Sequence, residues 1–332
     1  MIKKIFLSIL SLPFLLITSV RNFLYNIGFF NSYEFNIPII SVGNLVLGGT
    51  GKTPITEYLI RLLSDKYKVA VLSRGYGRKS NDFILASSNT NADIIGDEPM
   101  QYYRKYNNIT ISVDSNRVRG IKKLNSMNIN PQVILLDDAY QHRKVKPKIS
   151  ILLTDYNNLY CDDNFFPFGN LREGPKNACR ADIVLVTKCN ENLNENEKIK
   201  VTNKLNLSIH QKIFFSSVKY LDILCNEEGQ IQIDEFKNKK FTLLTGIANH
   251  SYLVNYLKNK GYDFNHISFN DHHNYSDNDI RKLNFNEVII TTEKDYVKLY
   301  ERIRTKLFYL PIEFVIENEE EFNDQILNSI WY

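Results

Sequence analysis

Short apolar, strand-like runs alternate with helical stretches along the first two thirds of the chain. The runs lie at residues 37–42, 69–73, 133–137, 149–154 and 183–187. Strands that are separated by helices are typical of βαβ units, in which a parallel sheet lies between helices. The pattern therefore predicts an α/β fold with a mostly parallel sheet wrapped by helices.

The pattern changes near residue 213. Two strand-like runs, IFFSSVKYLDIL and QIQIDEF, are separated by the turn-like NEEG, which predicts a β-hairpin. Beyond it, FTLLTGIAN, a helix around 251–259 and VIITTEKDYVKL predict a second, smaller α/β unit. The expected segments are an N-terminal membrane-associated helix (1–28), a core domain (29–212), a β-hairpin linker (213–240) and a smaller C-terminal α/β domain (241–332).

The chain begins with an uncharged apolar stretch. It runs from Ile5 to Val20, after Lys3 and Lys4, and has Pro13 at its middle. A secretory signal peptide has a similar layout, but no small-residue cleavage site follows. The stretch is shorter than the roughly 20 apolar residues of a membrane span and contains polar residues, which favours a helix lying in the membrane interface. A spanning helix and a buried core helix are the alternatives.

Composition narrows the class of protein. With 332 residues, 43% of them hydrophobic, the chain is long enough for about two packed domains. The formal charge of +4 is too small for a general nucleic-acid binder. The four cysteines show no zinc or disulfide spacing, which favours a reducing compartment.

The segment IPIISVGNLVLGGTGKTPITEYLIRLL has the order strand, glycine-rich turn and amphipathic helix. In a phosphate-binding loop of this kind, backbone N–H groups surround a triphosphate, the lysine contacts its β and γ oxygens, and the threonine hydroxyl binds Mg²⁺. The strict pattern has glycine at position 46, where this chain has valine, and an ordinary glycine-rich turn is the alternative. The predicted ATP-binding residues are Val46, Leu47, Gly48, Gly49, Thr50, Gly51, Lys52 and Thr53.

A second apolar strand, in QVILLDDAYQH, ends in Asp137 and Asp138. Nucleotide-binding α/β folds place a carboxylate there to hold Mg²⁺. Two acids after a strand are also an ordinary start of a loop. Together with the glycine-rich turn upstream, they predict that ATP binds with Mg²⁺, which Thr53 would also contact.

Eight short motifs follow one another along nearly the whole chain. They are SVGNLVLGGTGKTP (41–54), LSRGYGR (72–78), GDEP (96–99), DDAYQH (137–142), LRE (171–173), TGIAN (245–249), DHH (271–273) and TEKD (292–295). In this order and spacing they resemble the tetraacyldisaccharide 4'-kinases, the lipid A 4'-kinases of Gram-negative bacteria. The departures are mild, since Ala139, Tyr140 and His250 stand where the family usually has Gly, Phe and Pro.

The resemblance implies transfer of the γ-phosphate of ATP to the 4'-hydroxyl of a tetraacyldisaccharide 1-phosphate, a lipid A precursor, which gives the 1,4'-bisphosphate (lipid IVA). Such a substrate stays in the bilayer, because each buried CH₂ contributes about 0.8 kcal/mol. We therefore expect a peripheral or monotopic inner-membrane protein whose active site is on the cytoplasmic side. The expected partners are the glycolipid and the membrane surface, with neither nucleic acid nor an obligate protein partner.

The resemblance also implies roles for side chains. Asp97 would be the base that accepts the hydroxyl proton, and His272 from the second domain would be its hydrogen-bonded partner. Taken alone, Asp97 reads equally well as a helix N-cap, and His272 as a turn residue. If the pair acts, domain closure assembles the site.

Further side chains complete the expected site. Glu173 is expected to share Mg²⁺ with the two aspartates, and TEKD has no expected role beyond capping the next helix. Guanidinium groups suit phosphate oxygens. The predicted substrate-binding residues are Arg74, Tyr76, Arg78, Arg117, His142 and Arg172.

Two other functions remain as alternatives. A P-loop GTPase or metal-chaperone NTPase would need an N/TKxD element, and the candidate at residues 187–190 lacks the Asp. A membrane-associated ATP switch that recruits proteins would leave the GDEP and DHH motifs without a purpose.

Overall fold

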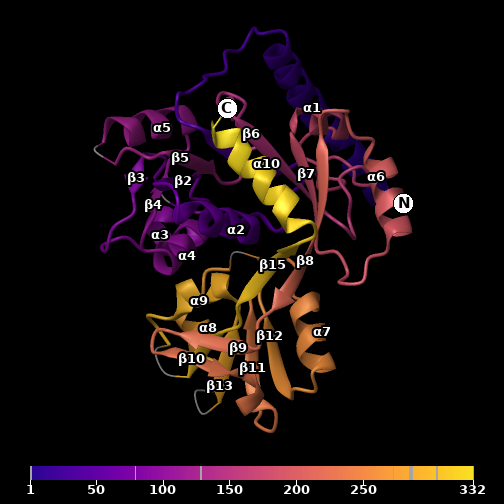
Figure 1. Cartoon of the computed structure of the whole chain (residues 1–332). Helices are drawn as coiled ribbons and strands as arrows, with labels where there is room; N and C mark the ends of the chain where they lie inside the picture. Colours follow the sequence, from indigo (N-terminus) through magenta and orange to yellow (C-terminus); the bar gives the residue numbers. More distant parts are fainter. Residues whose placement is uncertain are drawn as a thin grey trace.

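The structure, a computed structural model, describes residues 2–331 except 79, 128, 272, 284–286 and 304–305, and for residues 2–10 and 331 it describes the backbone alone. Within this part, the strands form two sheets. The larger sheet lies in the upper part of Figure 1 and the smaller sheet lies below it.

In the described residues the larger sheet has nine strands, in the order β15-β8-β7-β6-β1-β5-β2-β4-β3. All neighbours pair in parallel except β3 with β4 and β15 with β8. The five strands expected from the sequence are present as β1, β2, β5, β6 and β7, because their apolar residues are buried between helices. The bounds are β1 (Ile39–Asn44), β2 (Val69–Ser73), β3 (Ile84–Leu85), β4 (Thr110–Val113), β5 (Val133–Leu136), β6 (Ile149–Asp155), β7 (Ile183–Thr187), β8 (Lys212–Tyr220) and β15 (Ile312–Ile316).

Helices cover both faces of this sheet (Figure 1). On one face, α2 (Lys52–Ser64) and α10 (Glu319–Trp331) bury Leu59, Leu63, Phe322 and Ile326 against the strands. On the other face lie α5 (Arg117–Ser126) and α6 (Glu195–Leu205). Two shorter helices, α3 (Ala92–Ile95) and α4 (Asp97–Lys105), follow β3, and the 3₁₀ helix η1 (Pro175–Arg180) precedes β7.

The smaller sheet has the order β10-β9-β14-β13-β11-β12 in the described residues. β9 and β10 form an antiparallel hairpin at NEEG, but most of the run IFFSSVKYLDIL is β8 of the larger sheet and not the first strand of the expected linker hairpin. β11, β12, β13 and β14 run parallel. The fold class predicted from the sequence is therefore confirmed. The elements are β9 (Ile223–Asn226), β10 (Gly229–Gln232), η2 (Ile233–Phe236), β11 (Phe241–Thr245), α7 (Ser251–Asn259), β12 (Phe264–Ser268), α8 (Asp277–Arg281), β13 (Val288–Thr291), α9 (Glu293–Leu299) and β14 (Leu307–Tyr309).

After the smaller sheet, the chain returns to the larger one. β15 pairs with β8 from Ile312 opposite Tyr220 to Ile316 opposite Ser216, and α10 then packs on the core. Strand pairing thus places residues 312–331 with the larger sheet, whereas the sequence pattern had put them in the smaller domain. The reason is that Phe314 and Ile316 complete the core around β8, a pairing that local periodicity does not reveal.

The helix α1 (Ile2–Asn26) lies against the larger domain. The Ser11 hydroxyl donates to the Phe165 carbonyl at 3.0 Å, and the rings of Phe14 and Phe166 are 5.9 Å apart. The opposite face of α1 exposes large apolar side chains, among them Leu12, Leu16 and Phe23. In the described residues, no helix combines the length and the apolar character needed to cross a membrane.

Candidate active site

The predicted phosphate-binding loop connects β1 to α2. Gly51 precedes α2 in the left-handed region at φ 87°, and a Cβ there would lie 2.9 Å from Cζ of Phe314. The Asn44 amide donates to the Thr50 hydroxyl at 2.8 Å, and the Thr187 hydroxyl donates to the Thr50 carbonyl at 2.9 Å. The loop is therefore held from β1, β7 and β15, and position 51 requires glycine.

The valine that departs from the strict pattern has a structural reason. Val46 is buried and forms a bridge with Leu171, and the amide of Leu47 donates to the Asn170 carbonyl at 2.7 Å. The segment before the glycines is thus extended and paired with the LRE segment. This pairing places Arg172 beside the phosphate-binding loop.

Asp138 lies between two cations at this loop. Its carboxylate is 3.7 Å from Nζ of Lys52 and 3.3 Å from Nη1 of Arg172. Burial opposes ionisation, but Lys52 and Arg172 outweigh it and hold the pKa of Asp138 below its usual value. The structure thus brings together Lys52, Asp138 and Arg172 as an ionised cluster.

Asp137 is buried beneath this cluster. Hydroxyls of Thr56, Ser73 and Tyr102 approach its carboxylate at 3.4–3.5 Å. Burial, followed by the charges of Glu98 and Asp138, raises the pKa of Asp137 to about 7. A cation bound beside it would favour the ionised form.

The predicted substrate-binding residues divide into two groups. Arg117 is buried and donates to the main-chain carbonyl of Asp137 at 3.1 Å. Burial, and then the charges of Arg117 and Arg74, lower the pKa of His142 to about 3, so its ring is neutral and stands among cations. This group, which adjoins Asp138, has the charge that an anionic ligand needs.

The SRGYGR loop holds the second group. Arg78 donates from Nε to the Arg74 carbonyl at 3.1 Å and so closes the loop on itself, while Tyr76 is exposed. A Cβ on Gly75 would lie 2.7 Å from the Ile95 carbonyl, so glycine allows this loop to contact the GDEP segment. Arg78 therefore supports the loop rather than pointing freely into solvent.

Asp97 is the first residue of α4, and the N-cap is Gly96. Its Oδ2 lies 2.7 Å from Nζ of Lys298 on α9, in the smaller domain. The expected partner His272 lies outside the described residues. The residues on either side of it contact α9. Nζ of Lys294 lies 3.0 Å from Asp271, and Lys298 donates to the His273 carbonyl at 3.2 Å. The DHH segment thus meets the GDEP segment through α9.

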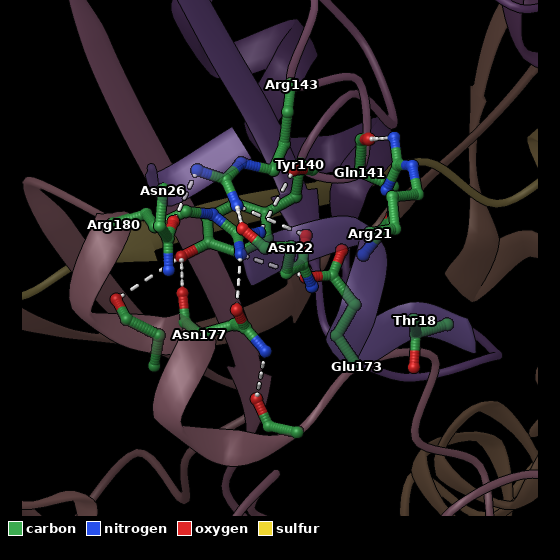
Figure 2. Close-up of polar contacts among 12 residues, drawn as sticks. Thr18, Arg21, Asn22, Asn26, Tyr140, Gln141, Arg143, Glu173, Asn177 and Arg180 are labelled. Carbon is green, nitrogen blue, oxygen red and sulfur yellow. Dashed lines mark hydrogen bonds and ion pairs between the residues drawn. The ribbon is translucent and has the colours of Figure 1, made fainter. Parts of the chain in front are cut away.

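The contacts of Glu173 are with Asn22 on α1 and with Arg180 (Figure 2), and the described residues contain no cluster that joins it to Asp137 and Asp138. Its Oε2 accepts from Asn22 at 2.8 Å and from Arg180 at 2.9 Å. Arg143 donates to the Asn22 carbonyl at 2.8 Å. The structure therefore groups Glu173 with the N-terminal helix and not with the paired aspartates.

Comparison with known proteins decides the family. The profile of the family described as Tetraacyldisaccharide-1-P 4'-kinase matches residues 3–331. A tetraacyldisaccharide 4'-kinase of Flavobacterium johnsoniae is 49% identical over 95% of this chain and 94% of that protein, and one of Bacteroides thetaiotaomicron is 40% identical over 95% and 90%. This chain belongs to the tetraacyldisaccharide 4'-kinase family. The resemblance seen in its motifs is thereby confirmed.

A solved structure agrees with this membership of the tetraacyldisaccharide 4'-kinase family. The structure described as the "apo" form of LpxK from Aquifex aeolicus in complex with ATP matches with a TM-score of 0.80 and 29% identity, over 97% of this chain and 98% of that one. The chain is thus an ATP-dependent kinase of this family, with the whole fold shared rather than the nucleotide-binding part alone.

The TEKD motif of the family, for which the sequence offered no role beyond a cap, organises the smaller domain. Thr292 is the N-cap of α9, and its hydroxyl hydrogen-bonds to Asp295. The buried Asp295 also accepts from the Gly246 amide at 2.8 Å and from the Tyr275 hydroxyl at 2.9 Å. It therefore joins TGIAN to the segment after DHH. The Thr-x-x-Asp spacing signalled the cap, but not these distant contacts.

A preformed metal cage is absent from the described part of the chain, where no three His, Cys, Asp or Glu side chains are grouped to hold a cation. Magnesium in kinases is commonly held by one or two carboxylates together with substrate phosphates and water. The pair Asp137 and Asp138 beside Lys52 fits that donor set.

Proposed function

We propose that this chain transfers the γ-phosphate of ATP to the 4'-hydroxyl of a tetraacyldisaccharide 1-phosphate and gives the 1,4'-bisphosphate. The observation that carries the proposal is the match over nearly the full length to tetraacyldisaccharide 4'-kinases, joined to an intact phosphate-binding loop. Family membership supports the reaction, and the site geometry supports the assignment of residues.

The phosphate-binding loop and its neighbours would hold the nucleotide. Backbone N–H groups between Gly48 and Gly51 would surround the phosphates, and Lys52 would neutralise the γ-phosphate. Mg²⁺, when bound through Thr53, Asp137 and Asp138, would offset the charge that develops on the phosphate oxygens. Binding of ATP would also separate Lys52 from Asp138, since the two groups contact each other here at 3.7 Å.

Asp97 would act as the base for the attacking hydroxyl, with His272 as its partner. The support is its place at the start of α4, against the smaller domain and next to the SRGYGR loop. The cations Arg74, Arg117 and Arg172, together with neutral His142, would bind the phosphate of the lipid and the transferred phosphoryl group. Glu173 would hold the LRE segment in place through its contacts with Arg180 and Asn22.

The N-terminal helix would bring the enzyme to its lipid. Its outward residues Leu12, Leu16, Val20 and Phe23 recur every three or four positions and are exposed, as are Ile17 beside them and Ile27 just after the helix. Phe166 and Phe168 extend this apolar surface beyond the helix. An amphipathic helix of this kind lies in the bilayer interface, and we propose peripheral or monotopic association with the cytoplasmic side of the inner membrane.

The deciding experiment is incubation of the purified protein with Mg·ATP and the disaccharide lipid, followed by mass spectrometry for one added phosphate. The Lys52→Ala variant is the matched control, and it should form no product while it keeps the wild-type melting temperature, because Lys52 is part of no apolar cluster. If GTP outcompetes ATP for the nucleotide site, the GTPase alternative is favoured instead. If ATP hydrolysis is stimulated by a protein partner and is unaffected by the glycolipid, the ATP-switch alternative is favoured.

A further inference from the structure

Lys298 joins the two domains at the proposed base. From α9 in the smaller domain, its Nζ lies 2.7 Å from Oδ2 of Asp97 in the larger domain and donates to the His273 carbonyl at 3.2 Å. The exposed fractions of the two side chains are 8% for Lys298 and 14% for Asp97. One ammonium group therefore contacts both segments that the reaction requires to meet.

The helix that presents Lys298 is fixed at its other end. Asp295, one turn earlier on α9, is fully buried and accepts from Gly246 and Tyr275. Residues three apart on a helix lie on neighbouring parts of its surface. The TEKD segment thus fixes the position of Lys298, and this is a structural role for that segment.

Other ion pairs of α4 and α9 residues lie near the pair formed by Lys298 and Asp97. Lys294 lies 3.7 Å from Glu98, Lys105 lies 3.0 Å from Glu293, and Arg104 lies 3.2 Å from Glu227 just after β9. Each could serve domain docking alone. Lys294 likewise contacts both segments, through Glu98 and Asp271. Lys298 differs because its partner is Asp97 itself, the proposed base.

We propose that Lys298 is a positioning residue for phosphoryl transfer, which holds the Asp97 carboxylate ionised and oriented against the DHH segment. The proposal rests on the proposed function, in which Asp97 receives the proton of the sugar hydroxyl. A carboxylate can accept that proton only when it is ionised, and an adjacent ammonium favours the ionised form. Orientation matters as well, since small misplacements of a reacting group lower rates strongly.

The test compares Lys298→Met, Lys298→Arg and the matched control Arg104→Met, with full steady-state kinetics on Mg·ATP and the disaccharide lipid. Arg104→Met also removes an ion pair between the domains, on α4 itself, but its partners Glu227 and Glu301 are exposed and belong to neither the GDEP nor the DHH segment. We expect Lys298→Met to lower kcat by roughly 10- to 100-fold with the KM for ATP changed less than about twofold. Lys298→Arg should recover part of the loss, and Arg104→Met should stay within about threefold of the wild type.

The pH profile separates positioning from stability. Lys298 and Lys294 on α9, Tyr275 after DHH and Glu98 on α4 all act on or near Asp97. Loss of the Lys298 charge makes the carboxylate easier to protonate, so the acidic limb of kcat/KM should move to higher pH. An unmoved limb, a kcat within twofold of the wild type, or equal losses in Lys298→Met and Arg104→Met would overturn the proposal. Full activity of Asp97→Asn would instead refute the proposed base, and that result is distinguishable from the others.

Discussion

Asn22→Ala and the double change Leu16→Ser with Ile17→Ser should separate the two faces of α1. Asn22 is 3% exposed and faces the protein, where its amide donates to the buried carboxylate of Glu173 (Figure 2). Leu16 and Ile17 are 65% and 67% exposed on the opposite face. If the inner face anchors the helix and the outer face binds lipid, the two variants fail different assays.

The expected magnitudes follow from these contacts. A hydrogen bond to a buried charged group contributes about 1.5–3 kcal/mol, so Asn22→Ala should lower the free energy of unfolding by about 2 kcal/mol. Glu173 keeps its contact with Arg180, which limits the loss. Each of the outer substitutions removes about 1.5 kcal/mol of apolar transfer free energy, or roughly tenfold in membrane affinity per residue.

Urea unfolding in mild detergent measures the first quantity, and flotation with vesicles of phosphatidylethanolamine and phosphatidylglycerol measures the second. Asn22→Ala should lower the urea midpoint with an unchanged slope and keep its vesicle binding. The Leu16 and Ile17 variant should keep its midpoint and lose vesicle binding. Equal vesicle binding by this variant, or a normal midpoint for Asn22→Ala, would refute the division into two faces.

Two further predictions concern the charged groups. Asp138→Asn should raise the Mg²⁺ concentration needed for half-maximal rate as well as lower kcat, measured by magnesium titration at fixed ATP, and an unchanged requirement would remove Asp138 from the metal site. Burial, followed by the charge of Glu57, raises the pKa of Glu293, so the stabilising protonated form is lost as the pH rises from about 4.5 towards 7. Glu293→Gln should therefore be more stable than the wild type by about 1 kcal/mol at pH 8, and thermal melts should show this advantage shrinking towards pH 5.

Local patterns in the sequence were sufficient for much of the fold and part of the site. The strands β1, β2, β5, β6 and β7 are short apolar runs, and a run buried on both faces stays recognisable without tertiary information. The glycine-rich turn likewise carries its own signal, because Gly51 adopts a conformation that other residues avoid.

Local sequence patterns did not predict contacts between segments that are far apart along the chain. Glu173 reads as an acid in the short LRE motif, yet its partner Asn22 is 151 residues away on α1. Lys298 likewise looks like an ordinary surface lysine of a short helix, and only the packing of α9 on α4 brings it to Asp97. The spacing of Lys294 and Lys298, four apart, placed both on one helix face but could not name the acids opposite.

The path of the chain gives a reason for the charges to gather between α4 and α9. The smaller domain is inserted between β8 and β15, which are neighbours in the larger sheet, and the Leu221 amide donates to the Pro311 carbonyl at 3.0 Å where the two connections leave it. Two paired connections should resist twisting more than a single linker does, so we expect any movement of the smaller domain to be a bending towards or away from α4. Such bending changes the distance between α4 and α9 directly. Ion pairs at that interface would therefore respond to such bending, and we expect Lys298, which lies 2.7 Å from Asp97, to couple the position of the smaller domain to the orientation of the proposed base.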